Sequence, residues 1–421
     1  MSFDRSDPGA TASFPSPPAA DYAAVDAAID AVGAVGFVAV GGRHDSDLRY
    51  LTRFEGPERE YAFVRIPGKS VLCAPEGDVR RAGAQFDGEV AADRVGDPAG
   101  ERAAAVLDRE LGSRGATPTT GVVLVPRTIP HDAAVYLERA GYDLQSTAAV
   151  AEARVTNSDA EIDAIDGVQR AAIAAVREAE RLLAAADVGA DGELRREGRP
   201  LTADCLRRTT NAELARRGVT DAGNTAVSAG TGDDRTAGDV VPADESPIRA
   251  DEPLTITVAP RGPHGYHGSL ARTVVVDSDG GWERRAYVAV ESALDAALAE
   301  IEGGAVARAV GREADAELAA FGFDPAGESV GDGPAESGHG VGLSRRERPS
   351  LDSDAELRVG SVVHVEPRIT DPERGTVRLS ALVVVTADGS ERLGDGDPSF
   401  APRESRERSE GDVGEETRRA E

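Results

Sequence analysis

The order of predicted helices and strands repeats within the second half of the chain, and this repeat constrains the fold more than any other feature. Ser158 and Glu161 have the spacing of a capping box in front of apolar residues at three- and four-residue steps, which predicts a long helix to about Asp187. The predicted elements are 158–187, 203–217, 225–229, 254–259 and 266–276 in the first set, and 287–301, 306–321, 361–366 and 377–386 in the second. Two helices followed by antiparallel strands, twice over, predict a pseudo-twofold domain with a curved sheet backed by helices.

The first half of the chain has a different pattern. Strands are predicted at 36–40, 61–66, 70–73 and 121–125, and helices at 21–33, 101–111 and 131–140. Strands that alternate with helices predict an α/β domain with a mixed sheet. We expect residues 21–152 to form this first domain and residues 153–395 the second. Residues 1–20 and 396–421 have few apolar side chains and are predicted to be disordered, the latter as a charged tail.

The charge of the chain excludes one class of partner. The sequence has 75 acidic and 47 basic residues, which give a formal net charge of −28 spread over its length. Such a chain does not hold nucleic-acid phosphates nonspecifically. Lys69 is its single lysine, and arginine with excess carboxylate is typical of halophilic, haloarchaeal-type proteins. An acidic protein from a GC-rich genome is the alternative interpretation.

The sequence predicts neither a membrane protein nor an exported one. No run approaches the roughly 18 apolar residues of a membrane span, and the first residues lack the basic end and apolar run of a signal peptide. Cys73 and Cys205 are too few for a disulfide framework or a cysteine zinc site. We therefore expect a cytoplasmic protein with reduced thiols.

Several short segments carry a family resemblance through their order and spacing. They are Gly338-His339-Gly340-Val341-Gly342-Leu343, Glu347-Arg348-Pro349, Val362-Val363-His364-Val365-Glu366-Pro367 and Val377-Arg378-Leu379, preceded by Asp47-Leu48-Arg49-Tyr50-Leu51-Thr52, Ala259-Pro260-Arg261, Tyr266-His267-Gly268 and Arg272-Thr273. Together they resemble the pita-bread family of metallopeptidases, which includes methionine aminopeptidase, Xaa-Pro aminopeptidase, prolidase and creatinase. The resemblance covers roughly residues 21–395 and is closest to Xaa-Pro aminopeptidase and prolidase. It implies an α+β fold with the two-domain creatinase/prolidase architecture: a small α/β N-terminal domain and a pseudo-twofold pita-bread domain.

The resemblance also implies a metal site, and most of its ligands are missing. Peptide-hydrolysing members bind two divalent metals (Mn, Co or Zn) through two Asp, one His and two Glu. In this chain His339 and Glu366 match the histidine and the first glutamate. The other three positions fall on Thr257 or Val258, on Ser269 and on Ser380, which supply no negative charge for hard cations.

Two further histidines of the family are also replaced. A substrate-contacting histidine aligns with Arg346, and an earlier one aligns near Val241. We therefore expect no metal cofactor, and a degenerate member that binds a peptide or a protein in its cleft. The alternative is an active Xaa-Pro metallopeptidase or a creatinase-like hydrolase with a rebuilt site. The resemblance leaves open whether the chain forms a homodimer.

The retained polar residues have several interpretations. His339 fits a structural histidine in a Gly-His-Gly turn, Glu366 fits a local hydrogen-bond network, and Arg346 could pair with one of them in place of a metal. Arg378 and Arg272 fit structural arginines paired with carboxylates. A relocated site is a further alternative, in which His267, His339, His364 and Glu366 converge on a single zinc or iron.

Overall fold

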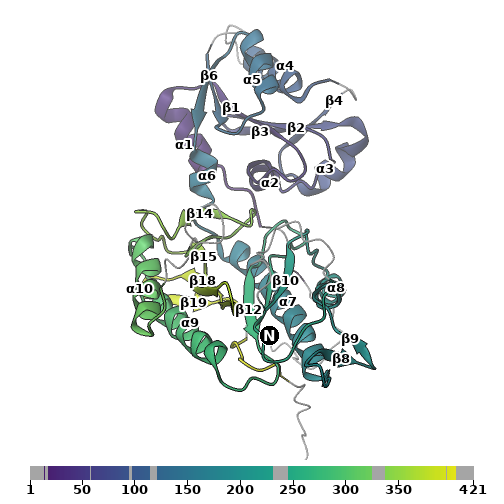
Figure 1. Cartoon of the computed structure of the whole chain (residues 1–421). Coiled ribbons are helices and arrows are strands. Elements are labelled where there is room, and N and C mark those ends of the chain that lie inside the picture. Colours follow the sequence, from purple (N-terminus) through teal and green to yellow (C-terminus); the bar gives the residue numbers. More distant parts are fainter. Residues whose placement is uncertain are drawn as a thin grey trace, which may run out of the picture.

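The structure is a computed structural model with two domains that lie one above the other in Figure 1. It describes residues 14, 18–56, 58–93, 97–113, 121–230, 245–324, 337–394 and 396–403. The smaller domain is formed by the N-terminal segment and the larger one by the rest of the chain, as expected from the two sequence patterns.

The smaller domain has a six-stranded mixed sheet in the order β4-β3-β2-β1-β5-β6. Its elements are α1 (Ala23–Val32), β1 (Gly36–Gly41), α2 (Ser46–Thr52), β2 (Tyr61–Ile66), β3 (Lys69–Pro75), η1 (Glu76–Asp78), α3 (Val79–Gln85), β4 (Glu89–Asp93), α4 (Ala99–Ser113), β5 (Val122–Pro126), α5 (His131–Arg139), β6 (Asp143–Thr147) and α6 (Ala149–Ala153). One face of the sheet packs against α4 and α5, through residues such as Leu107 and Leu137. The other face packs against α1, α2 and α3, through Ile29, Leu51 and Ala82. Helices on both faces bury the central strands, as expected for an α/β domain.

The larger domain contains the predicted repeat of helices and strands. Its elements are α7 (Asp159–Ala184), β7 (Asp187–Val188), β8 (Leu194–Arg196), β9 (Arg199–Pro200), α8 (Ala203–Arg216), β10 (Thr225–Ala229), β11 (Leu254–Val258), β12 (Leu270–Val274), α9 (Trp282–Ala299), α10 (Ala307–Ala320), β13 (Gly338–Gly340), β14 (Glu347–Ser350), β15 (Val362–Val365), β16 (Arg368–Asp371), β17 (Gly375–Arg378), β18 (Ala381–Val385) and β19 (Ser390–Arg392). The capping box at Ser158 is present, with the Glu161 side chain accepting from the Ser158 backbone. The predicted strand at 377–386 is instead two strands, since β17 pairs with β16 and β18 pairs with β15.

The two halves of the larger domain meet at β12 and β18. The order β10-β11-β12 forms one sheet and β14-β13-β15-β18-β19 forms another. Ser380 N donates to Ala271 O over 3.1 Å, and Ala271 N donates to Ser380 Oγ over 2.8 Å. These bonds join the sheets across the pseudo-twofold axis of the domain.

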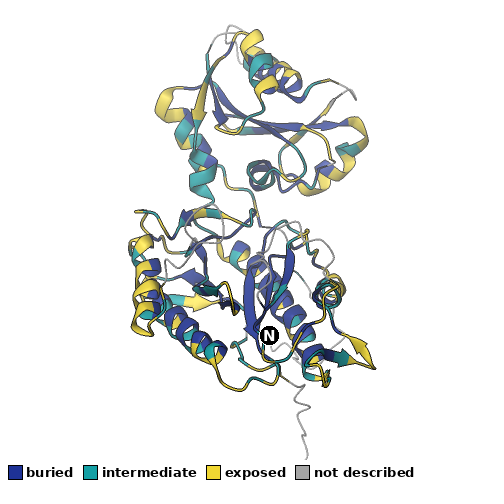
Figure 2. Ribbon diagram, in the orientation of Figure 1, coloured by how far each residue is buried: buried dark blue, intermediate teal, exposed yellow. Residues whose placement is uncertain are grey.

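The hydrophobic core continues from one domain into the other. One cluster of buried residues contains Leu51 and Phe63 of the smaller domain together with Ile165, Tyr266 and Leu343 of the larger. Figure 2 shows the buried interior of both domains in dark blue, with exposed residues on the outer faces of the helices. Because buried apolar surface is the main favourable term in folding, this shared cluster holds the domains together.

Residues beyond the predicted limits of 20 and 395 contact the larger domain. Phe400 packs edge to face on Tyr287 with 5.2 Å between ring centroids, and its carbonyl accepts from Val275 N over 2.9 Å. Phe14 packs against a cluster that includes Leu214. Residues 396–403 therefore contact the larger domain through Phe400, and the predicted start of the tail at residue 396 stays a prediction. The remaining tail residues lie outside the described ones.

Candidate functional site

Three of the predicted site residues lie together where β13 and β15 pair. His339 is directly opposite His364 in the antiparallel register, and the two rings are 5.3 Å apart between centroids. Glu366 follows β15, and its Oε2 lies 3.7 Å from His364 Nε2. The two-residue alternation along the strand therefore places His364 and Glu366 on one side, as predicted.

Arg378 provides the positive charge beside Glu366. Its side chain has no exposed surface, and its Nη1 donates to Glu366 Oε1 over 3.2 Å. The prediction that Arg378 pairs with a carboxylate is confirmed. A guanidinium ion thus lies beside the one family carboxylate that this chain retains.

The corresponding prediction for Arg272 is wrong. Arg272 is buried, and its guanidinium donates to the carbonyl oxygens of Ala271, Ser380 and Gly396 over 2.9, 2.6 and 3.2 Å. Among the residues that the structure describes it has no ion pair with a carboxylate. Its position between β12 and β18 explains this, because backbone carbonyl groups lie within hydrogen-bonding distance there, whereas Glu180 acts on it only through its charge.

The strand register shows which of Thr257 and Val258 occupies the position that faces the cleft. Thr257 lies opposite Ala271, and Ser269 is two residues from Ala271, so Thr257 and Ser269 share one face of the sheet. Val258 lies opposite Leu270, and both belong to the hydrophobic cluster around α7. Thr257 is thus the position that faces the cleft with Ser269.

Thr257, Ser269 and Ser380 have uncharged side chains, and each lies in a different hydrogen-bonding environment. Thr257 Oγ1 is buried and has no hydrogen-bond partner in the described structure. Ser269 is held by Gln169, which accepts from Ser269 N over 2.9 Å and donates to Ser269 O over 3.0 Å. Ser380 Oγ accepts a hydrogen bond from Ala271 N, so this oxygen is already used in joining the two sheets.

These residues do not fit a pair of divalent metals. Hard cations need several carboxylate oxygens, and this cleft offers Glu366, already beside Arg378, with neutral hydroxyls at the other carboxylate positions. Within the described part of the chain, no three histidine or carboxylate ligand atoms of the cleft lie within 4.8 Å of one another. The family metal pair therefore has no adequate set of ligands here.

The residues of the relocated single-metal site come from two parts of the larger domain. His267 Nδ1 lies 3.4 Å from Ala259 O, on the β11–β12 hairpin, while His339 and His364 belong to the other sheet. Within the described residues, His267 forms no group of three possible ligand atoms within 4.8 Å with His339, His364 or Glu366. Their convergence on one metal therefore stays a prediction. Sequence alternation gave the side of each strand but not the distance between the two sheets.

Arg346 lies on the exposed loop between β13 and β14. Its positive charge contributes to the low pKa of His364, so it lies near the histidine pair. Its proposed pairing with His339 or Glu366 stays a prediction. The second expected histidine position, near Val241, lies outside the described residues.

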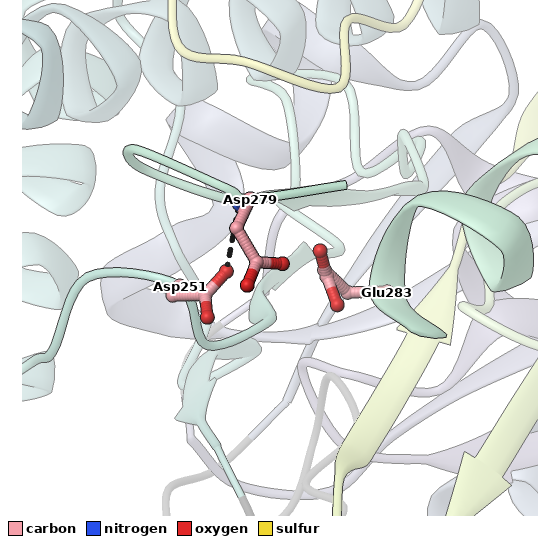
Figure 3. A group of neighbouring side chains, drawn as sticks. All are labelled: Asp251, Asp279 and Glu283. Carbon is pink, nitrogen blue, oxygen red and sulfur yellow. Dashed lines mark hydrogen bonds between the residues drawn. The ribbon is translucent and has the colours of Figure 1, made fainter. Parts of the chain in front are cut away.

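One group of carboxylates elsewhere was missed by the sequence analysis. Asp251, Asp279 and Glu283 face one another beside the start of α9 (Figure 3), and they form the one group of three possible metal-ligand atoms within 4.8 Å in the described ranges. Asp279 N donates to Asp251 Oδ1 over 3.1 Å, and Glu283 Oε1 accepts from Ser278 Oγ and Gly281 N. These bonds explain the group as the capping of a helix terminus.

Burial and nearby positive charges keep His267 and His364 neutral. Burial lowers the pKa of His267 to about 4, and the charges of Arg261 and Arg345 act in the same direction. Burial holds the pKa of His364 well below its ordinary value, with His339 and Arg346 adding to the effect. Neutral imidazoles can donate or accept hydrogen bonds toward a ligand in the cleft.

These shifts predict a loss of stability in acid. The unfolded chain protonates its histidines near pH 6.5, whereas the folded protein resists protonation at His267 and His364, so stability present above about pH 6.5 is lost as the pH falls toward 4. We expect His364→Gln to reduce the slope of unfolding free energy against pH in this window by up to about 1.4 kcal/mol per pH unit. Urea unfolding at a series of pH values measures the slope. His131→Gln, at an exposed position on α5, is the control, and an unchanged slope in His364→Gln would contradict the prediction.

The comparison with known families decides the family of the chain. Metallopeptidase family M24 matches residues 164–387, more than half of the sequence. The chain belongs to family M24. This match covers both helix-and-strand repeats and the cleft strands, so the M24 scaffold is present.

Curated relatives match this M24 chain over a limited segment. The chain is 32% identical over 130 residues to "Xaa-Pro dipeptidase" of Pyrococcus horikoshii, covering 30% of this chain and 35% of that protein. It is 35% identical over 135 residues to "Uncharacterized peptidase YqhT" of Bacillus subtilis, covering 31% and 35%. The matched segment thus spans about a third of these curated relatives.

Solved structures match almost the whole M24 chain in fold. Prolidase from Pyrococcus furiosus has a TM-score of 0.71 at 17% identity, covering 88% of this chain and 99% of that one. X-Pro aminopeptidase from Thermotoga maritima has a TM-score of 0.73 at 17% identity, covering 88% and 98%. The N-terminal domain of FACT complex subunit SPT16 from chickpea has a TM-score of 0.64 at 14% identity, covering 88% and 93%. The predicted two-domain creatinase/prolidase architecture is confirmed.

The cytoplasmic location and the homodimer stay predictions. In the part of the chain that the structure describes, none of the helices has the length and apolar character needed to cross a membrane.

Proposed function

We propose that this M24 protein binds a peptide or a protein segment in its cleft and does not carry out two-metal hydrolysis. The observation that carries the proposal is the buried Glu366–Arg378 pair, with Nη1 and Oε1 3.2 Å apart. A fixed guanidinium beside the retained glutamate repels a dication and leaves the carboxylate balanced without one.

The neutral positions support the same conclusion. A pair of divalent ions is bound by opposite charge, and Thr257, Ser269 and Ser380 contribute none. Ser380 Oγ is also occupied by Ala271 N. Restoring a single carboxylate would therefore leave the site with too little negative charge to bind two divalent ions.

Unsatisfied polar atoms support ligand binding. Thr257 Oγ1 and His364 Nε2 are buried and have no hydrogen-bond partner in the described structure. An unsatisfied buried polar atom costs about 1–3 kcal/mol, and an amide or carbonyl of a bound peptide would remove that cost. Both atoms are uncharged hydrogen-bonding groups, which favours a peptide over an ion as the ligand.

The active-enzyme alternative makes the opposite prediction about metal. We expect less than one Mn, Co or Zn per chain after purification at high salt, and no cleavage of Xaa-Pro dipeptides when any of these metals is added. Elemental analysis and a ninhydrin assay of released proline measure both. Two tightly bound metals with hydrolysis would establish the Xaa-Pro metallopeptidase. Hydrolysis without metal would favour the creatinase-like alternative.

The triple variant Thr257→Asp, Ser269→Asp and Ser380→Glu provides the matched gain-of-binding control for that assay. It restores the missing carboxylates on the same strands, and we expect it to bind Mn where the wild type does not. Ser269→Asp alone is expected to bind none.

A further inference from the structure

A small cavity lies between the two domains, away from the paired histidines of the cleft. It has a volume of ≈ 30 Å³. The segment from Arg43 to Arg49 and Glu55 line it from the smaller domain, and Arg261, Pro263 and Gly265 of the β11–β12 hairpin line it from the larger. A space of this size holds one or two water molecules or one small ion, and is far below the roughly 300 Å³ of a small-molecule pocket.

The lining of the cavity has more positive than negative groups. Arg43, Arg49 and Arg261 are cationic, against the carboxylates of Asp45 and Glu55. Asp45 accepts the Leu48 N–H over 2.8 Å as the cap of α2, and Glu55 pairs with Arg43 over 2.6 Å. This local excess of positive charge occurs in a chain whose net charge is −28.

Arg49 and Arg261 are left without a carboxylate. Arg49 Nε and Nη2 donate to the carbonyls of His264 and Pro263 over 3.2 and 3.1 Å, and Arg261 Nη1 lies 2.6 Å from His44 Nδ1. Among the residues that the structure describes, neither guanidinium forms an ion pair. Burial lowers the pKa of Arg49; the charge of Glu55 opposes this effect, and nearby Arg261 and Arg53 add to it. Burial also lowers the pKa of His44, with Arg261 and Arg43 acting in the same direction, so His44 is neutral and its Nδ1 accepts from Arg261.

We propose that this cavity binds one small monovalent anion, either a carboxylate group or a halide, between Arg49 and Arg261. Guanidinium groups bind carboxylates and halides through charge-assisted hydrogen bonds, and two of them facing one small space favour an anion over water. The site stands apart from the peptide-binding proposal, because its lining residues include none of the paired residues of the cleft.

The anion has two possible sources. One is a free ion such as chloride from solution. The other is the C-terminal carboxylate of a peptide in the cleft, since Arg261 forms a β-bridge with His267 on the hairpin between cavity and cleft. The second source rests on the proposed function, and the first does not.

Chloride-35 NMR of the full chain at constant ionic strength tests the site itself. We expect wild-type protein to broaden the chloride line, acetate to reverse the broadening by competition, and Arg261→Gln to weaken chloride binding about tenfold or more. Arg261→Gln should fold, because the side chain of Arg261 bonds to His44 at an exposed position. Arg261→Lys keeps the charge and should retain part of the binding.

Arg109→Gln is the control, because Arg109 is an exposed arginine of α4 that pairs with Glu89 at 3.1 Å. It should leave the broadening unchanged. Equal broadening in wild type and Arg261→Gln, with both folded by circular dichroism, would overturn the proposal, as would a chloride effect that acetate cannot compete.

Calorimetry with Ala-Pro and its C-terminal amide distinguishes the two sources. If the peptide carboxylate occupies the cavity, wild type prefers the free acid about tenfold and Arg261→Gln loses this preference. Equal binding of acid and amide, with chloride binding intact, assigns the cavity to a free anion. Absence of any peptide binding would count against the proposed function, and the chloride result would still decide the anion site.

Discussion

Arg378→Met is expected to lower the free energy of unfolding by about 3–5 kcal/mol, because it leaves the carboxylate of Glu366 in the protein interior without its guanidinium partner. Arg378 is fully buried, and Glu366 Oε1 lies 3.2 Å from its Nη1. Urea unfolding in high salt, followed by circular dichroism, measures the change.

The control for this variant is Arg374→Met. Arg374 lies on the same hairpin, but its side chain is exposed and 3.9 Å from Asp371, so its loss should cost less than about 1 kcal/mol. In the double variant Arg378→Met with Glu366→Leu, the orphaned charge is removed and most of the stability should return. A double variant no more stable than Arg378→Met would show that packing, rather than the ion pair, is the role of Arg378.

Arg154→Met is expected to lower the free energy of unfolding by at least as much as Arg378→Met, because Arg154 forms ion pairs with two carboxylates at the domain junction. Its Nη1 donates to Asp47 Oδ1 over 2.6 Å, and its Nη2 donates to Glu347 and to Ser344 Oγ. Burial raises the pKa of Glu347 despite the attraction of Arg154. Without the arginine, two carboxylates repel each other in a poorly hydrated space, which we expect to cost about 3–5 kcal/mol.

Thermal unfolding of Arg154→Met should also lose its single transition, because the network connects α2 of one domain to the β13–β14 loop of the other. Arg348→Met is the matched control, since Arg348 also joins the domains through Glu152 at 2.6 Å, but both side chains are exposed. We expect a change of less than about 1 kcal/mol for it. If both variants unfold alike, burial of the Arg154 network does not contribute to the junction.

Much of the cleft was predictable because it depends on local pattern. The alternation along β15 placed His364 with Glu366, and the Gly-His-Gly segment placed His339 on the neighbouring strand. The identity of each missing ligand position followed from motif spacing. The choice between Thr257 and Val258 did not, because one residue of register reverses the face of a strand, and register is fixed by the pairing of β11 with β12.

Partners of charged side chains were less predictable. The sequence predicted a carboxylate partner for Arg378 without naming it, and the structure identifies that partner as Glu366. The sequence also favoured an ion pair for Arg272, which instead donates to backbone carbonyls. A long side chain can reach several neighbouring groups, and only the folded structure shows which of them it contacts.

The sequence by itself determined the element order, the helix start at Ser158 and the family scaffold, because periodicity, capping and motif spacing act over a few residues. Tertiary structure alone decided the Arg154 network and the arginine-lined cavity. Each of these depends on residues more than 100 positions apart, such as Arg49 and Pro263. Contacts of that kind are set by how sheets and domains pack, and no local pattern encodes their distances.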